Sequence, residues 1–197
     1  MQLACHSVTI QEYSNSDNKY KHIVYGYHST LFGKCLIAVY IEQYESLSHQ
    51  AICHLAFIDQ NLDDAITSLK NNWHASYISI DEAVTSKVIQ LLFTMPNDNN
   101  KISILMKGSN FQLQVWHSLL SVNKGTTTSY EEIAISIGNI KATRAVARAI
   151  AQNRIAYLIP CHRILPKSRT IGNYRWGVKL KQMLIDHEAH YGTPGRI

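Results

Sequence analysis

The first half of the chain consists of short apolar runs separated by polar turns, followed by two stretches with helical spacing. Runs rich in Val, Ile, Tyr and Leu at residues 23–27, 35–42 and 51–58 predict three strands. Apolar positions recur at helical spacing in residues 62–72 and 80–92, which predicts two helices. Strands that precede helices indicate a small α/β domain.

The second half predicts a succession of helices instead. Ser109 is a favourable N-cap, and apolar side chains follow it at helical spacing. These side chains are Phe111, Val115, Leu119 and Leu120. We therefore expect a mostly α-helical second domain.

A helix–turn–helix pattern comes next along the chain. Ser129 and Glu132 have the spacing of a capping box, and Gly138-Asn139 ends the helix that they begin. After a short turn, the Ala-rich residues 141–152 predict a second helix. This outline is found in many DNA-binding proteins, although other helical pairs share it.

The second of these helices has a basic face. Arg144 and Arg148 stand four residues apart, with Ala145 and Ala149 beside them. Like charges at this spacing destabilise an isolated helix, so an anionic partner explains them best. Small alanine side chains would let a DNA backbone approach closely. A solvated face on an ordinary helix is the alternative.

Charge is distributed unevenly along the chain. Residues 1–100 contain 5 Lys and Arg against 10 Asp and Glu (5 − 10 = −5), and residues 101–197 contain 14 against 4 (14 − 4 = +10). The sign changes at the turn-forming residues 96–100. We predict an N-terminal domain over 1–95, a linker over 96–107 and a second domain over 108–197 that faces a polyanion.

The four cysteines are expected to be free thiols. No secretory signal and no apolar run of about 18 residues is recognisable, so we expect a cytoplasmic protein without a membrane partner. Neither Cys5-His6 nor Cys53-His54 has the spacing of a zinc site, and we predict no metal. Cys35 and Cys53 are predicted to be small buried side chains.

Cys161 is the cysteine in a setting that suggests chemistry. An apolar run over residues 155–159 ends at Pro160, and Cys161, His162 and Arg163 follow. A thiolate attacks carbon better than a thiol, and a nearby His or Arg favours the thiolate. Since neighbours on a strand point to opposite faces, contact between Cys161 and His162 requires a turn or a bridging water.

A helix predicted over residues 178–190 carries an acidic candidate. Its apolar stripe is expected to contain Leu180, Met183, Leu184 and His187. Glu188 borders this stripe, and a half-buried carboxylate needs a partner, for which His162 is the candidate. Glu188 orienting His162, and His162 activating Cys161, would follow the logic of a catalytic triad. A solvated carboxylate at a helix end is the alternative.

These motifs together resemble the O6-alkylguanine-DNA alkyltransferases, also called methylated-DNA–protein-cysteine methyltransferases, of the bacterial type. The resemblance covers residues 108–191, and seven motifs occur in the family's order. They are Phe111–Trp116, Thr128-Ser129-Tyr130 with Ile133-Ala134, Thr143–Val146, Asn153, Ile159–Ile164, Gly172–Gly177 and Leu184–Glu188. The resemblance implies a ribonuclease-H-like α/β N-terminal domain and a mostly α second domain with a winged helix-turn-helix.

The resemblance also implies roles for individual residues. Cys161 would accept the alkyl group in a single, irreversible turnover without a cofactor. His162 would deprotonate Cys161 through a water, and Glu188 would orient the imidazole. Asn153 would brace the turn before the active site, and Tyr174 would support the leaving guanine.

The implied partner is double-stranded DNA that contains O6-alkylguanine, with O4-alkylthymine as a second candidate lesion, and the expected protein is a monomer. Arg144 would fill the gap left by the flipped base, and Tyr130 would push on a phosphate. Further DNA contacts are assigned to Ala145, Arg148 and Arg163.

Two other functions fit parts of this pattern. A non-catalytic binder of alkylated DNA would lack the cysteine, and a helix-turn-helix regulator would not need the Pro-Cys-His-Arg sequence. One departure from part of the family is Arg175-Trp176 in place of smaller residues. We expect the ring of Trp176 to lie over the pocket entrance and to exclude bulky alkyl groups.

Overall fold

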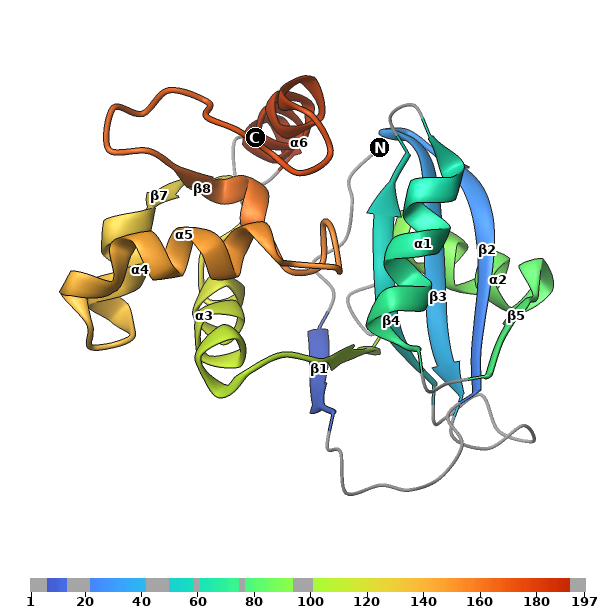
Figure 1. Ribbon diagram of the computed structural model, residues 1–197. Helices are drawn as coiled ribbons and strands as arrows, with labels where there is room; N and C mark the ends of the chain where they lie inside the picture. The colour runs from blue at the N-terminus through green and yellow to red at the C-terminus, as the bar shows by residue number, and fades with distance from the viewer. Residues whose placement is uncertain are drawn as a thin grey trace. The chain divides into compact units, whose positions relative to one another are not determined.

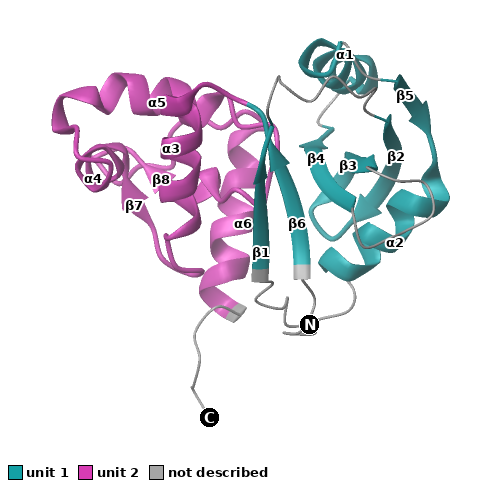
Figure 2. Cartoon of the chain, turned by 90° about the horizontal axis from the view of Figure 1, so that it is seen from below, with its two compact units in different colours: residues 1–107 teal, residues 108–197 magenta. Residues whose placement is uncertain are grey.

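The computed structural model describes residues 7–13, 22–41, 50–58, 61–74, 77–93 and 101–191 (Figure 1). The chain divides into two compact units, residues 1–107 and 108–197 (Figure 2). Among the described helices, none is long and apolar enough to cross a membrane.

Unit 1 contains a mixed six-stranded sheet. Its strands are β1 (Ser7–Glu12), β2 (His22–Thr30), β3 (Gly33–Ile41), β4 (Gln50–Phe57), β5 (Tyr77–Ile80) and β6 (Lys101–Met106). They lie in the order β1-β6-β4-β3-β2-β5. Strand β3 pairs antiparallel with both β2 and β4, whereas β5 pairs parallel with β2, and β6 pairs parallel with both β4 and β1.

Successive side chains of a strand point to opposite faces of the sheet, so its buried strands present apolar side chains on both faces. One helix covers each of these faces. Helix α1 (Leu62–Asn72) contributes Leu69 to a buried cluster that includes Ile23. Helix α2 (Glu82–Phe93) contributes Val84 to a cluster on the other face that includes Val24. Figure 1 shows α1 in front of the sheet and α2 behind it.

The sequence predicted the three central strands and helix α1 correctly, but three features differ. Strands β1 and β5 were missed, and the helix expected from residue 80 begins at Glu82, because Ile80 still pairs with Tyr25 of β2. The predicted linker is wrong for residues 101–106, which form strand β6. Residues 96–100 and the Cys5-His6 pair lie outside the described residues.

Unit 2 is mostly helical. Its elements are α3 (Asn110–Leu120), β7 (Thr128–Ser129), α4 (Tyr130–Ser136), η2 (Ile140–Ala142), α5 (Thr143–Ala151), η3 (Cys161–Arg163), β8 (Ile164–Leu165) and α6 (Val178–Tyr191). The short strands β7 and β8 pair parallel. The structure confirms the predicted combination of an α/β first half and a mostly helical second half.

The predicted helix ends of unit 2 are present. Ser109 and Ser129 each form a complete capping box, with Gln112 and Glu132 as the returning side chains. After α4 the chain turns at Gly138, which has a φ of +75° that favours glycine. Helix α5 is shorter than predicted because residues 140–142 form a separate 3-10 turn.

Helix α5 has one buried and one exposed side. Val146 and Ile150 are buried, and Arg144, Ala145 and Arg148 are exposed, as the basic face predicted. The prediction for Ala149 is wrong. This residue is 2% exposed, and its carbonyl oxygen accepts a hydrogen bond of 2.9 Å from the Trp116 indole of α3.

Candidate active site

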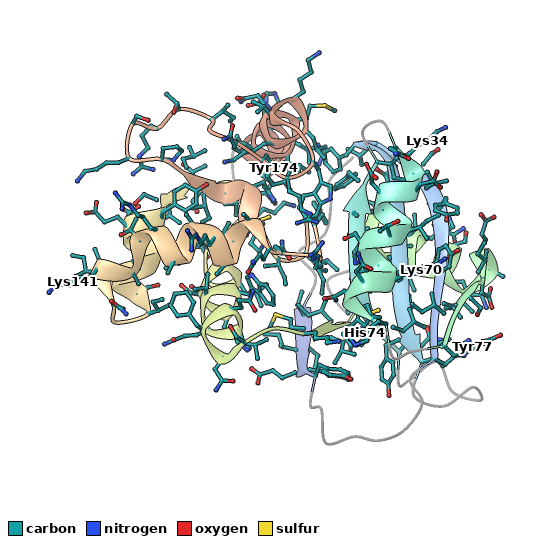
Figure 3. The ribbon with its side chains drawn as sticks, in the orientation of Figure 1. Lys34, Lys70, His74, Tyr77, Lys141 and Tyr174 are labelled. Carbon is teal, nitrogen blue, oxygen red and sulfur yellow. The ribbon has the colours of Figure 1, made fainter. Side chains whose placement is uncertain are left out.

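A cavity of about 410 Å³ in unit 2 contains Cys161 in its lining. The other lining residues come from the start of α4, the second half of α5 and the loop before α6: Tyr130, Ala147, Ile150, Ala151, Asn173, Tyr174 and Arg175. Figure 3 labels Tyr174 on that loop. The fold thus brings Tyr130, Cys161 and Tyr174 to one cavity, although 44 positions (174 − 130) separate the first from the last.

The backbone of the apolar run before Cys161 is a compact turn. Tyr157 has a φ of +66°, unusual for a residue with a side chain, and Cys161 begins the 3-10 turn η3. Residues 155–161 are all buried inside unit 2. A short apolar run indicates burial but does not determine the backbone conformation, so the sequence alone could not predict this turn.

Asn153 holds this turn together. Its buried side-chain amide Nδ2 donates to the carbonyl oxygen of Ile159 at 3.0 Å and to Sγ of Cys161 at 3.1 Å. Its Oδ1 accepts from the backbone N–H of Ile155 at 2.9 Å. One side chain therefore satisfies buried backbone groups and fixes the position of the sulfur.

Burial controls the protonation of the Cys161 thiol. The residue is 5% exposed, and burial raises the pKa of its thiol above the ordinary value. The Asn153 amide, the Tyr174 hydroxyl and the positive charge of Lys181 oppose this change in pKa only in part. The resting sulfur is a thiol near neutral pH, so its activation requires a base.

His162 is placed to be that base. Its Nε2 lies 3.1 Å from Oε1 of Glu188, which confirms the contact that the sequence suggested. Burial lowers the pKa of His162, while Glu188 acts in the opposite direction, so the imidazole is neutral near pH 7. Within the described residues Nδ1 has no hydrogen-bond partner, which leaves it available to accept a proton.

Arg163 completes an ion-pair network. Its Nε and Nη2 donate to the two carboxylate oxygens of Glu188, each at 2.8 Å, and Nη1 donates to the carbonyl oxygen of Val122 at 2.5 Å. All three nitrogens bind within unit 2, so Arg163 has a structural role there, and its DNA contact stays a prediction. Sequence reasoning missed this role because it assigned the positive charge of Arg163 to DNA and proposed His162 alone as the partner of Glu188.

The network should stabilise the fold in a pH-dependent way. Burial alone would raise the pKa of Glu188, but His162 and Arg163 lower it to about 2 from an ordinary value of 4.5. A carboxyl with a depressed pKa contributes stability above pH 4.5 that is lost as the pH falls toward 2. The difference corresponds to about 3 kcal/mol in the free energy of unfolding.

We therefore expect Glu188→Gln to lower the free energy of unfolding at pH 7 and to flatten its decline between pH 5 and pH 2.5, measured by urea titration. Glu131→Gln is the matched control, because Glu131 forms an exposed pair with Lys167 at 3.2 Å that should contribute little. Equal slopes in wild type and Glu188→Gln would contradict the assigned role.

Two further residues near Cys161 were not predicted. Lys181 of α6 is 1% exposed, and its Nζ donates to the carbonyl oxygen of Ile164 at 2.7 Å. Burial lowers the pKa of its ammonium to about 8. The ring of Tyr157 stacks on that of His162, with an interplanar angle of 7° and centroids 6.5 Å apart.

The stripe of α6 differs in part from the prediction. Met183 is 48% exposed, and Leu180, Lys181, Leu184 and Glu188 form the buried side. Lys181, Leu184 and Glu188 have the spacing of residues on one side of a helix, so the sequence contained a signal that Lys181 is buried. The charge of the lysine led to the wrong expectation of exposure.

The structure separates the remaining predicted site residues into two groups. Tyr130 and Tyr174 line the cavity with Cys161, whereas Arg144, Ala145 and Arg148 lie on the exposed side of α5 and do not line it.

The prediction that the ring of Trp176 lies over the pocket entrance is wrong. This ring is 7% exposed, packs edge-on against Tyr174 with centroids 5.3 Å apart, and is not part of the cavity lining.

Comparison with known proteins supports the reading of unit 2. Residues 110–190 match the family described as 6-O-methylguanine DNA methyltransferase, DNA binding domain. The chain is 33% identical over 162 residues to the bifunctional transcriptional activator/DNA repair enzyme Ada of Escherichia coli, covering 80% of this chain and 43% of Ada. It is 42% identical over 81 residues to the methylated-DNA–protein-cysteine methyltransferase of Kluyveromyces lactis, covering 41% and 43%.

The fold extends the similarity beyond unit 2. A Mycobacterium tuberculosis OGT solved in complex with DNA has a TM-score of 0.60 and 26% identity, covering 87% of this chain and 94% of that one. The chain spans about two fifths of the length of the two curated relatives named above. The chain is therefore similar to the 6-O-methylguanine DNA methyltransferases, both in residues 110–190, which match the DNA-binding domain of that family, and in the fold of most of the chain.

Proposed function

We propose that the protein repairs DNA by direct reversal, as a methylated-DNA–protein-cysteine methyltransferase that moves the alkyl group of O6-alkylguanine onto Cys161. The observation that carries this proposal is the buried thiol in a cavity, next to a neutral imidazole held by a buried carboxylate. A non-catalytic lesion binder or a regulator would not require this arrangement.

The chemistry follows from the roles of these groups. His162 takes the thiol proton at Nδ1, directly or through a water, while Glu188 holds the opposite nitrogen. The thiolate attacks the alkyl carbon, a C–S bond forms and the C–O6 bond breaks. The electron pair passes to guanine, which takes up one proton with Tyr174 supporting the leaving base. Because a thioether is stable, each chain acts once.

Access to O6 requires an extrahelical base, since O6 of a paired guanine lies inside the duplex. Arg144 fills the resulting gap from the exposed side of α5, with Ala145 and Arg148 along the same surface. Tyr130, at the cavity and at the start of α4, contacts the neighbouring phosphate. The partner would be double-stranded DNA, and the solved complex of the Mycobacterium tuberculosis relative with DNA supports DNA as the partner.

The finer description of the fold is part of this proposal. Unit 1 would be the ribonuclease-H-like domain, supported by the antiparallel strands β2, β3 and β4 with β5 parallel to β2. Unit 2 would be the winged helix-turn-helix domain, formed around α4 and α5. O4-alkylthymine is a second candidate lesion. Each chain would act as a monomer, in a cytoplasm that keeps Cys161 reduced.

The direct test is the intact mass of the protein after mixing with a duplex that contains one O6-methylguanine. We expect a gain of one CH₂ group per chain, located by peptide mapping on Cys161, with restored guanine in the DNA. A mass that stays unchanged with excess duplex, or a gain at another residue, would refute the proposal.

Arg144→Ala should separate DNA handling from chemistry. We expect transfer from a duplex to slow by roughly tenfold to a hundredfold, because the extrahelical base loses the side chain that offsets a few kcal/mol of unstacking. Transfer from the free base O6-methylguanine should stay close to wild type. The measurement is the second-order rate for both substrates, and equal losses on both would indicate a different role for Arg144.

A further inference from the structure

One charged side chain belongs to the cavity lining. Arg175 is the cationic member, while the other lining residues of the described chain are aliphatic, phenolic, amide or thiol side chains. The cavity therefore presents a guanidinium to whatever is bound beside Cys161, and no carboxylate of the lining neutralises it.

The guanidinium of Arg175 has a defined anchor. Its Nη1 donates to the carbonyl oxygen of Ala151 at 3.2 Å, at the last residue of α5. The carbonyl end of a helix attracts cations, so this contact keeps the guanidinium at the cavity. Arginine has further N–H donors, which remain available for an anion.

The surroundings favour an anion in the cavity as well. The guanidinium of Arg175 interacts electrostatically with the sulfur of Cys161 and also with Arg154, whose like charge adds to the positive potential. The buried ammonium of Lys181 acts on the same sulfur from α6. A negative group beside the sulfur would thus lie near two cations, Arg175 and Lys181, and Arg154 adds positive charge close to the first of them.

We propose that Arg175 selects O6-alkyl groups that end in a carboxylate, with carboxymethyl as the smallest, over neutral groups of the same shape. This inference rests on the proposed transfer to Cys161. The transferred carbon must come within bonding distance of Sγ, so a carboxylate attached to that carbon lies in the same cavity. Guanidinium groups bind carboxylates with charge-assisted N–H bonds, an option that a neutral amide lacks.

The reaction balances without another reactant. The thiolate of Cys161 forms a C–S bond to the methylene carbon, the C–O6 bond breaks, and guanine takes the electron pair and one proton. The product is S-carboxymethylcysteine, whose carboxylate remains beside Arg175. During the attack the guanidinium offsets the repulsion between the thiolate and the carboxylate of the substrate.

The test compares two isosteric lesions in one duplex sequence, O6-carboxymethylguanine and O6-carbamoylmethylguanine. The readout is the ratio of their second-order transfer rates to Cys161. Because both lesions sit in the same DNA, any contribution of Arg175 to general DNA binding cancels in the ratio. Arg175→Gln should lower the carboxymethyl-to-carbamoylmethyl ratio by roughly tenfold, since one unit charge near the surface of a protein is removed.

Two further variants control for charge and for folding. Arg175→Lys keeps the charge and should retain most of the ratio. Arg169→Gln should leave it within about twofold, because Arg169 is an exposed arginine of unit 2 whose Nη1 also donates to a backbone carbonyl oxygen, at Thr127, but which does not line the cavity.

The outcomes separate this inference from the proposed function. An equal loss on both lesions in Arg175→Gln would show that Arg175 binds DNA phosphates and would overturn the selectivity. The same ratio in wild type and Arg175→Gln would overturn it too. Failure of the wild type to take a methyl group from O6-methylguanine would instead refute the transfer to Cys161 itself.

Discussion

Cys161→Ala should abolish alkyl transfer while binding to lesion-containing DNA stays within about threefold of wild type. The sulfur supplies the bond-forming electron pair, and no other lining residue of the cavity is a comparable nucleophile. The thiol lies inside unit 2 and takes no part in the exposed side of α5, so DNA affinity should not depend on it. Intact mass measures transfer, and fluorescence anisotropy measures binding.

Cys35→Ala and Cys53→Ala are the matched controls. Both thiols are buried in unit 1, and burial raises the pKa of Cys35 to about 12, which makes it a poor nucleophile. Each control should transfer at the wild-type rate. Methyl transfer by Cys161→Ala, or its loss in either control, would disprove the assignment of the acceptor.

Asn153→Ala should reduce both stability and activity. Nδ2 and Oδ1 of Asn153 bond to backbone groups of Ile155 and Ile159 and to the sulfur, all buried. Leaving buried polar groups unpaired costs about 1–3 kcal/mol each, so we expect a loss of about 3 kcal/mol in the free energy of unfolding. The transfer rate should fall by roughly a hundredfold because the thiolate loses a donor and a fixed position.

The two effects can be separated by experiment. Asn139→Ala is the control for stability, because Asn139 is exposed and makes no side-chain capping bond at η2. Transfer by Asn153→Ala is measured well below its midpoint of thermal unfolding, where the variant is folded. A wild-type rate under these conditions would limit Asn153 to a structural role.

Local signals in the sequence were sufficient for the helical part of the fold. The capping boxes at Ser109 and Ser129 and the turn at Gly138 depend on residues a few positions apart, so their chemistry is visible in the sequence. The pair of His162 and Glu188 was also found, because a carboxylate beside the apolar stripe of α6 needs a buried partner.

Features that depend on distant pairing were not predictable in the same way. Strand β5 has only four residues and two exposed apolar side chains, Tyr77 and Ile80, and its pairing with β2 decides its conformation. Figure 3 labels Tyr77 on this strand. The hydrogen bonds of Arg163 to Glu188 and of Lys181 to the carbonyl oxygen of Ile164 are likewise tertiary contacts between residues that are distant in the sequence.

The division of helix α5 into two sides affects how such a protein can diversify. Its inner side is fixed by packing, since the carbonyl oxygen of Ala149 binds the Trp116 indole and Val146 is fully buried. Arg144 and Arg148 on the outer side carry no such constraint. Evolution can therefore alter the affinity for DNA by single substitutions on the exposed side of α5. A substitution at Trp116 or at the position of Ala149 would instead require a compensating substitution at the other of these two residues.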